Sequence, residues 1–519
     1  MKILIITGLQ SYPIIKKLIG STKIHSVEVI KAQISVSAFL SESMTGELLE
    51  SVPVSNYDLI LLPGFIQWDT SSLEKKISVE IRKGPEFASD LQMTLKNLSD
   101  NNIKLSNEIP ANRLFEDTGK NTYQQIVKEQ YEIAINNIGS DTFFINEERS
   151  NILVGRNLPP PIIAEIVNCT NKSDKSIIKK AQHYISSGAD IIDIGCVANN
   201  PNPTRITEII KLIRTNFNTL ISIDSMEKSE LLAAVESGID LILSLDSGNY
   251  KDFITIPKEI PIVILPTNIK KGYFPKDPKT RVENLLNLTE KLQDYGFKKL
   301  IADPLLETPI VPGICNSLEA YFLYSKLSAI KKLPLFFGIS NVVELMDIDS
   351  VGINGLLASI AVELDVGVIF TVEHSVKLMR GVTELKEGIK LNYLSKQKKT
   401  PPINQGIQIF RAKGKTNQLK YKISESDGIN IDQINQDYIP DERGYFKIYL
   451  NHYVNKINVL HFSNDHILLN TLIGTSAEAI SKKMIELKLT TNLNHINYIG
   501  RELAKAQFCL FSGKPYIQD

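Results

Sequence analysis

Residues 188–195 read Gly-Ala-Asp-Ile-Ile-Asp-Ile-Gly, and this stretch decides the fold of the middle of the chain. Its apolar run is short, rich in β-branched isoleucine and ended by Gly195, as is typical of a buried strand in a parallel sheet. Asp193 interrupts the isoleucines, and a buried carboxylate is costly unless it serves a ligand or another polar group. The stretch therefore predicts a core strand that carries a functional side chain.

Seven further apolar runs of this kind flank the stretch, and most gaps between them hold an amphipathic, helix-forming segment. Eight strand–helix units over about 225 residues are what a (β/α)8 barrel requires. The sequence therefore predicts an α/β protein whose centre is a (β/α)8 (TIM) barrel. The eight runs lie at 162–167, 191–194, 220–223, 241–245, 262–265, 300–302, 335–339 and 368–372.

The segments on either side of the barrel predict two further domains. We expect an N-terminal α/β, Rossmann-like domain at 1–150, the barrel at 160–390 and a small C-terminal α+β domain at 406–519. Gly8 and Gly64 follow the two N-terminal strands, and without a complete G-x-G-x-x-G motif they indicate either tight turns or a nucleotide site. Outside the barrel, strand-like runs lie at 2–6, 58–62, 406–410, 445–450 and 457–462, and helical segments at 12–19, 116–138, 476–487 and 499–511.

The composition excludes several classes of protein. The 519 residues include 58 Lys plus Arg and 58 Asp plus Glu, so no overall positive field attracts nucleic acid. No apolar run reaches the roughly 18 residues of a membrane span, and residues 1–8 are typical of a strand rather than a signal peptide. The four cysteines lie far apart without a metal-binding spacing, which favours reduced thiols. We expect a cytoplasmic protein that binds neither nucleic acid nor membranes.

Polar side chains follow nearly every predicted strand of the barrel. Because the active sites of such barrels form at the carboxyl ends of the strands, we expect these side chains to meet at one mouth. Carboxylates accept bonds from N–H donors, amides bind phosphate or hydrated metal ions, and histidine donates to a leaving phosphate. The strand-end residues are Asn168, Asp193, Asp224, Ser244, Asp246, Asn268, Asp303, Asn341 and His374.

Five strand ends carry motifs that resemble those of dihydropteroate synthases and related pterin-binding barrels. Residues 188–195 are similar to the family's G-A-D-I-I-D-I-G-G, and 221–225 (Ile-Ser-Ile-Asp-Ser) are similar to I-S-I-D-T. Residues 166–170 resemble the first-strand motif with Leu-Asn-Val-Thr, 303–304 match the sixth-strand D-P, and 374–376 partly resemble R-V-H-D-V. All five occur in the family's order.

The three-segment layout looks closest to the archaeal dihydropteroate-synthase-like proteins, which place an extra α/β domain before the barrel and a small domain after it. The stretches 498–506 and 516–519 resemble the closing signature of that family.

The resemblance implies a transferase that condenses a hydroxymethyl-dihydropterin diphosphate with an arylamine and releases diphosphate with the aid of Mg2+. The amine would be p-aminobenzoate or a ribosyl-aminobenzene phosphate, in folate or methanopterin biosynthesis, and a homodimer is one expected assembly. By matched position it implies catalytic roles for Asn168, Asp224 and His374, with Asn168 also at the metal. The implied pterin-binding residues are Asp193, Asp224, Asp246, Asp303 and Asn341, and the phosphate-binding candidates are Asn168, Arg205, His374 and Lys377.

The phosphate end of the site departs from the family pattern. Synthases carry Ser-Arg-Lys after the seventh strand, whereas residues 340–342 here read Ser-Asn-Val. Two arginines of the family are also absent at the matched places, and charge-assisted contacts contribute roughly 1.5–3 kcal/mol each. Candidate replacements are Lys172, Arg205, Lys377 and Arg380, each of which is otherwise a solvated surface residue.

Two alternatives to a synthase therefore stay open. A pterin-dependent methyltransferase that passes a methyl group to a corrinoid partner would need no diphosphate site, although this chain shows no D-x-H-x-x-G motif of its own. A non-catalytic pterin-binding protein would keep the aspartates and lose the phosphate ligands.

Overall fold

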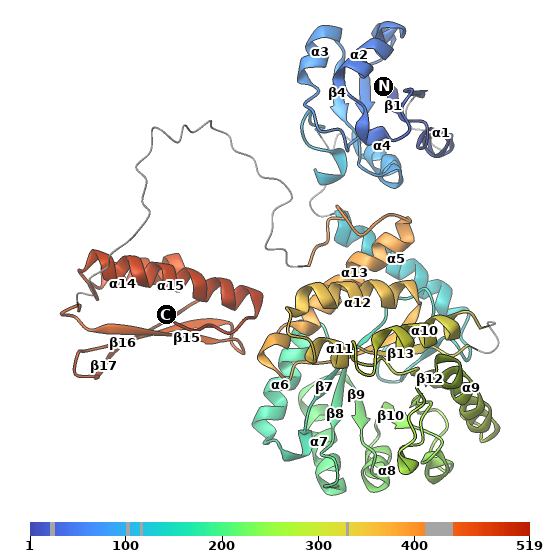
Figure 1. Ribbon diagram of the computed structural model, residues 1–519, viewed down its shortest axis with the longest axis vertical. Helices are drawn as coiled ribbons and strands as arrows, with labels where there is room; N and C mark the ends of the chain where they lie inside the picture. Colours follow the sequence, from blue (N-terminus) through green and yellow to red (C-terminus); the bar gives the residue numbers. More distant parts are fainter. Residues whose placement is uncertain (21–25, 100–103, 115–117, 328–331, 410–439, 519) are drawn as a thin grey trace. The chain divides into compact units, whose positions relative to one another are not determined.

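The computed structural model describes residues 1–20, 26–99, 104–114, 118–327, 332–409 and 440–518. Its centre is a closed barrel of parallel strands in the order β10-β11-β12-β13-β14-β7-β8-β9, with helices on the outside (Figure 1). The predicted (β/α)8 barrel is therefore confirmed, and each predicted strand overlaps an observed one. The strands are β7 (Ile162–Ile166), β8 (Ile191–Gly195), β9 (Leu220–Asp224), β10 (Leu241–Leu245), β11 (Ile262–Ile264), β12 (Leu300–Ala302), β13 (Leu335–Gly338) and β14 (Val366–Val372).

The barrel interior is filled by alternate residues of its strands. Ile163 of β7 belongs to a buried cluster to which all seven other strands of the barrel contribute as well. The hairpin of β5 (Phe143–Phe144) and β6 (Leu153–Val154) adds Phe143 to the same cluster, so this hairpin packs with the barrel. Since side chains alternate along a strand, Glu165 points to the same side of β7 as Ile163.

The helices surround the strands, and local sequence signals fix their ends. The first helix after β7 begins at the N-cap Ser173, whose hydroxyl accepts from the backbone N–H of Ser176, and ends at Gly188. Gly188 has a φ of 101°, a left-handed conformation that favours glycine and explains the first residue of the stretch 188–195. The elements are η5 (Cys169–Asn171), α6 (Asp174–Ser187), α7 (Pro203–Asn216), α8 (Lys228–Glu236), η6 (Tyr250–Phe253), η7 (Ile269–Lys271), α9 (Pro278–Asp294), α10 (Ile314–Ser325), α11 (Ser340–Glu344), α12 (Ser350–Glu363), η9 (Val376–Leu378) and α13 (Gly381–Lys398).

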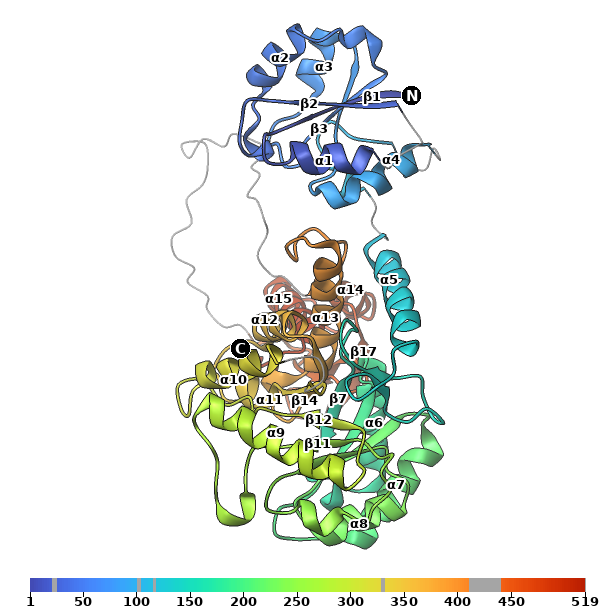
Figure 2. The same ribbon diagram turned by 90° about the vertical axis from the view of Figure 1, so that its right-hand side faces the viewer.

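The N-terminal segment forms a parallel sheet of four strands in the order β2-β1-β3-β4. Helices α1 and α4 cover one face and α2 and α3 the other (Figure 2), so the inner strands are buried on both faces and read as continuous apolar runs. The predicted α/β domain is confirmed. Its elements are β1 (Lys2–Thr7), α1 (Tyr12–Ile19), β2 (Ser26–Lys31), η1 (Ser37–Phe39), α2 (Glu42–Glu50), η2 (Val54–Asn56), β3 (Leu59–Leu62), α3 (Ser71–Ile77), β4 (Glu80–Lys83), η3 (Ala88–Asp90), α4 (Leu91–Ser99) and η4 (Ala111–Arg113), followed by α5 (Thr118–Ile135).

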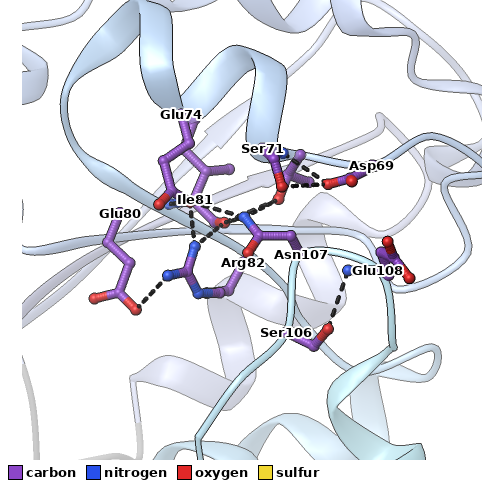
Figure 3. A network of polar contacts seen from close by, with 10 residues as sticks. Asp69, Ser71, Glu74, Glu80, Ile81, Arg82, Ser106, Asn107 and Glu108 are labelled. Atoms are coloured by element: carbon purple, nitrogen blue, oxygen red, sulfur yellow. Dashed lines mark hydrogen bonds and ion pairs between the residues drawn. The ribbon is translucent and has the colours of Figure 1, made fainter.

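A polar network holds the outer strand β4 (Figure 3). The Asn107 amide donates to Glu74 Oε2 at 2.8 Å, to the carbonyl of Ile81 at 3.0 Å and to Thr70 Oγ1 at 3.0 Å. Glu74 Oε2 also accepts from the backbone N–H of Ile81 at 3.2 Å and pairs with Arg82. Backbone groups at this edge are thereby satisfied within the domain and are not available for pairing with another sheet.

The C-terminal segment is a small α+β domain, as predicted. Its last residues extend along β15, where Gln518 accepts from the N–H of Ile448 at 2.9 Å and donates to the carbonyl of Phe446 at 3.0 Å. Tyr516 donates to Glu502 at 2.8 Å, which ties the tail to the final helix. The antiparallel sheet β15-β16-β17 and its helices comprise β15 (Tyr445–Asn451), β16 (Lys456–Phe462), β17 (Leu468–Gly474), α14 (Ala477–Glu486) and α15 (Leu493–Ser512).

Two details of the C-terminal segment differ from the prediction. Residues 406–409 form no strand, and residue 410 lies outside the described residues. Gly406 has a φ of 73°, which is incompatible with an extended strand. The edge strand β17 was not predicted, because Leu468 and Leu469 are both 50% exposed and the strand lacks an alternating apolar pattern.

Candidate functional site

A cavity of about 450 Å³ opens at the carboxyl ends of the barrel strands, and we call it the barrel-mouth cavity. Four carboxylates line it: Glu165 from β7, Asp224 from β9, Asp303 directly after β12 and Glu344 at the end of α11. Ser340 and Asn341 of α11 add further polar groups. A concave, mostly apolar space with a few convergent polar groups is typical of a small-molecule site. Its apolar walls are Met226, Leu243, Val263, Leu265, Leu305, Phe336, Leu345, Phe370 and Val372.

Asp303 and Asp224 can both accept hydrogen bonds from a ligand. Asp303 Oδ1 accepts from the Tyr321 hydroxyl at 2.9 Å and from the N–H of Leu305 at 2.8 Å, whereas its other oxygen has no partner among the described residues. Burial raises the pKa of Asp303 to about 6, and burial likewise raises the pKa of Asp224 to about 6. Both carboxyls are therefore mainly ionised at neutral pH and can accept bonds from N–H groups of a ligand.

A second feature is a cluster of three acidic side chains on β7, β8 and β9. Glu165 pairs in register with Asp193, and Gly195 of the same strand pairs with Asp224. Asp193 is fully buried, and it accepts a bond of 2.6 Å from the Ser222 hydroxyl while Oδ2 has no partner among the described residues. Burial, and then repulsion by Asp224 and Glu165, raises the pKa of Asp193 well above its ordinary value. Asp193 is thus the fully buried member of the cluster, and its surroundings favour its protonated form.

A second cavity of about 430 Å³ adjoins the end of β7, and we call it the lysine cavity. Four lysines from η5–α6 and the exposed His374 after β14 surround it. Lys172 and Lys175 form no ion pair with any described residue, so their positive charge is available to a ligand. Glu165 and Val372 line both cavities. The lysines are Lys172, Lys175, Lys179 and Lys180.

Glu373 plays a structural part at this wall. Its Oε2 lies 2.7 Å from His183 Nε2 and 3.7 Å from Lys180 Nζ, and its N–H donates to the Tyr184 hydroxyl at 3.1 Å. These contacts fix α6 against the end of β14. Lys180 is consequently neutralised in part, which leaves the other three lysines as the positive side of the cavity.

The structure brings several predicted residues together at these cavities. Asp224, Asp303 and Asn341 line the barrel-mouth cavity, and His374 lines the lysine cavity. Asp193 lies beneath them in the barrel core, next to Ser222 on the neighbouring strand.

Asp246 lies elsewhere in the loop after β10. Its carboxylate accepts from the N–H of Gly248 at 2.7 Å, the Thr267 hydroxyl at 2.9 Å and the N–H of Ile269 at 2.5 Å. Asp246 thus joins two loops and lines neither cavity. Its role in pterin binding stays a prediction.

Three other predicted residues also lie outside both cavities. Arg205 pairs with Asp174 at 2.6 Å and with Glu208 at 3.0 Å, and Lys377 donates to the carbonyl of Met346 at 2.5 Å. Asn168 is exposed at the N-terminal end of η5. Their phosphate-binding and metal-binding roles stay predictions.

Sequence reasoning missed Glu165 and most of the lysine cavity. Glu165 has a detectable signal, since it is a charged residue at an inward position within the apolar strand 162–166. Lys175 and Lys179 lie four residues apart on α6, which is equally typical of a solvated helix face, so only the fold reveals that they meet His374.

Comparisons with known proteins show the family of this chain. A family described as pterin binding enzyme matches residues 166–352, and the family PterinBD-DUF4346 matches residues 440–519. The uncharacterized protein MJ0107 of Methanocaldococcus jannaschii is 33% identical over 536 residues, which cover 100% of this chain and 98% of that protein. The chain belongs to the dihydropteroate-synthase-like family of pterin-binding proteins. MJ0107 matches this family member from end to end, so the two proteins share the flanking domains as well as the barrel.

More distant relatives of this dihydropteroate-synthase-like protein are synthases themselves. Dihydropteroate synthase of Streptococcus pyogenes serotype M3 is 26% identical over 176 residues, 31% of this chain and 64% of the enzyme. The solved Yersinia pestis enzyme with a pterine-sulfa conjugate is 19% identical with a TM-score of 0.37, covering 46% of this chain and 94% of its own. The Xanthomonas albilineans enzyme with 7,8-dihydropteroate is 14% identical with a TM-score of 0.37, covering 47% and 94%.

Within the described ranges, no helix of this family member combines the length and the apolar character that a membrane crossing demands.

Proposed function

We propose that this dihydropteroate-synthase-like protein binds a dihydropterin in the barrel-mouth cavity and transfers its methylene carbon from a diphosphate to an arylamine. The observation that carries the proposal is that Asp224 and Asp303 line one cavity, directly beside a cavity lined by four lysines. A pterin ring has an edge of N–H and NH2 donors, which two carboxylates can accept. The apolar walls, including Phe336 and Phe370, provide surfaces for the flat ring and exclude water.

The lysine cavity is suited to the diphosphate. Lysine ammonium groups bind phosphate as point charges and stabilise the negative charge that develops on a leaving diphosphate. Lys172, Lys175 and Lys179 are therefore proposed to replace the lysine and arginines that the family pattern places elsewhere. His374, which also lines the lysine cavity, is proposed to donate a hydrogen bond to a phosphate oxygen.

Mg2+ is proposed to arrive bound to the diphosphate. Among the described residues, no group of three or more His, Cys, Asp or Glu side chains is arranged to hold a metal ion. The metal ligand predicted from the sequence is the Asn168 amide oxygen. Every other part of the proposal concerns side chains of the chain itself.

The test is a turnover assay with the purified full-length protein. 6-Hydroxymethyl-7,8-dihydropterin diphosphate and p-aminobenzoate, or a ribosyl-aminobenzene phosphate, are supplied with Mg2+, and both diphosphate and the coupled pterin product are measured. We expect both products in equal amounts. Asp224→Asn should weaken binding of the pterin at least tenfold, since about 1.5–3 kcal/mol is lost with a charge-assisted bond.

The matched control is Asp252→Asn, which removes a partly exposed carboxylate that pairs with Lys270 at 2.7 Å on the barrel surface. It should leave binding and turnover unchanged. Binding of the pterin diphosphate without reaction of either amine would instead indicate a non-catalytic pterin-binding protein. Binding of a methyl-tetrahydropterin but not of the diphosphate would indicate methyl transfer.

A further inference from the structure

Glu165 is the only carboxylate among the described residues that lines both the barrel-mouth cavity and the lysine cavity. No described residue forms a hydrogen bond or an ion pair with its side-chain oxygens. Only its backbone carbonyl is engaged, by the Tyr184 hydroxyl at 2.9 Å. A half-buried carboxylate without a hydrogen-bond partner lowers the stability of the folded protein. Glu165 is therefore not placed at the junction of the two cavities for stability.

Gly195 on the neighbouring strand provides the space for this carboxylate. A Cβ atom added to Gly195 would lie 2.0 Å from Glu165 Oε1, a distance that no real contact permits. The carboxylate therefore packs directly over the glycine at the end of β8. Since any larger residue at 195 must displace it, the position of the carboxylate can be altered without changing Glu165 itself.

The groups around Glu165 favour a carboxyl that exchanges a proton near neutral pH. Burial, and then repulsion by Asp224, raises the pKa of Glu165 to about 7. The lysines of the lysine cavity lie on the other side, where a released proton can reach solvent. The titratable groups around it come from both cavities and from the neighbouring strands. They are Asp193 on β8, Asp224 on β9, Glu373 and His374 at the end of β14, Cys169 in η5, Lys180 and Tyr184 on α6, Asp303 and Glu344 in the barrel-mouth cavity and Lys172, Lys175 and Lys179 in the lysine cavity.

We propose that Glu165 accepts the proton that the amine loses as its nitrogen bonds to the pterin methylene carbon. This assignment rests on the function proposed above. With the ring in the barrel-mouth cavity and the diphosphate in the lysine cavity, the carbon that joins them lies at the junction that Glu165 lines. No other described carboxylate borders both spaces.

The step balances without a further reactant. The nitrogen lone pair forms the C–N bond, and the C–O bond breaks with its electron pair leaving on diphosphate. The nitrogen then carries one proton too many, and this proton passes to the Glu165 carboxylate. Loss of the proton to solvent restores the carboxylate for the next cycle.

The test compares wild type, Glu165→Gln and Glu165→Asp in the same turnover assay between about pH 5.5 and 8.5. In the wild type, kcat/KM for the amine should rise with pH through about 7 as the carboxyl loses its proton. Glu165→Gln should lower kcat/KM about 100-fold, near the low end of the range for a proton acceptor, and should abolish this rise. Glu165→Asp should keep the rise at a lower rate. Affinity for the pterin diphosphate should stay within about threefold in both variants.

Gly195→Ala provides a second test in which every acidic side chain is retained. It should lower kcat/KM because the added methyl group displaces the carboxylate, while pterin binding verifies that the barrel is folded. Glu290→Gln, on the exposed face of α9, is the matched control and should behave as wild type. If Glu165→Gln keeps both the rate and the pH dependence of an active wild type, the role of Glu165 is wrong and the proposed function stands. If the wild type couples neither amine, the proposed function fails, and the role of Glu165 fails with it.

Discussion

The barrel and the N-terminal domain both have a cavity at the carboxyl ends of parallel strands. The polar side chains of one cavity have hydrogen-bond partners within the domain, whereas several of those in the other cavity have none. The N-terminal cavity has a volume of about 270 Å³ and is lined by the ends of β1, β3 and β4. The barrel-mouth cavity has about 450 Å³. Open α/β sheets and barrels alike bind ligands at such strand ends, so topology alone does not distinguish the two.

In the N-terminal cavity the polar side chains satisfy one another. Ser37 Oγ accepts from the N–H of Gly8 at 2.9 Å and lies 3.1 Å from Thr7 Oγ1. The single carboxylate of this cavity, Glu86, pairs with Arg113 and accepts from Asn112 at 3.0 Å. A ligand here would have to compete with bonds that already exist.

In the barrel mouth the corresponding groups lack partners. The side-chain oxygens of Glu165 and Asp224 and one carboxylate oxygen of Asp303 form no hydrogen bond within the described part of the chain. Burial raises the pKa of each of these three carboxyls. The comparison teaches that buried polar groups left without partners distinguish a candidate site from a cavity that merely lies at strand ends.

The largest expected effect is on pterin affinity, which should depend on a carboxylate of the barrel-mouth cavity and not on the carboxylate of the N-terminal cavity. Asp303→Asn should raise the Kd for the pterin about 10- to 100-fold, because a charged acceptor of about 1.5–3 kcal/mol is lost from the site. Glu86→Gln should leave this Kd unchanged and lower the stability of the N-terminal domain, because Arg113 loses its partner. Isothermal titration of both variants measures the Kd. Equal pterin affinity for Asp303→Asn and wild type would show that the unpartnered oxygen binds no ligand.

The second prediction concerns the dependence of stability on pH. The pKa of Asp303 is about 6 in the folded protein, above its ordinary value of 3.8, so the folded state binds more protons between these values. The favourable contribution of Asp303 protonation to the free energy of unfolding is therefore fully present below about pH 4. It is lost as the pH rises through about 6. Asp303→Asn should raise the free energy of unfolding of the barrel by about 3 kcal/mol at pH 8 and by little at pH 4. Urea unfolding at both pH values measures this difference, and an equal change at both would contradict it.

The smallest expected effect concerns the lysine cavity. Replacing Lys172 and Lys175 together by alanine should weaken binding of the pterin diphosphate about five- to tenfold, since exposed ion pairs contribute roughly 0.2–1 kcal/mol each. The pterin without phosphate should bind as before, and the difference should shrink at high salt. Lys211→Ala, on the exposed side of α7, is the control. Equal losses for both ligands would show that these lysines do not bind the diphosphate.

Much of the fold was predictable because it rests on local patterns. Eight apolar runs separated by amphipathic segments identify the barrel, and the stretch 188–195 contains both a strand and the left-handed Gly188 that ends the helix before it. The edge strand β17 lacked such a pattern, because an edge strand with exposed side chains need not alternate. Residues 406–409 were wrongly predicted as a strand, because an apolar run without a partner strand does not determine pairing.

The candidate site was predictable only in part. Asp224 and Asp303 could be named from their place after apolar strands, and they do line one cavity. Asp246 has the same kind of place in the sequence, and Arg205 was predicted to bind phosphate. Their side chains are instead bound to Thr267 and Asp174. A sequence shows which groups are polar, but not which of them already have partners.

The sequence by itself determined the barrel, the flanking domains and the acidic character of the strand ends, because hydrophobic periodicity and chain connectivity act locally. Only the tertiary structure decided which of these residues face a shared space. Glu165 reaches the junction of two cavities because β8 ends in a glycine that leaves room for it, and Lys175 and Lys179 meet His374 because β14 closes the barrel against β7. The stretch 188–195 thus specifies a strand by its isoleucines, while its final glycine acts through a side chain 30 residues earlier in the chain.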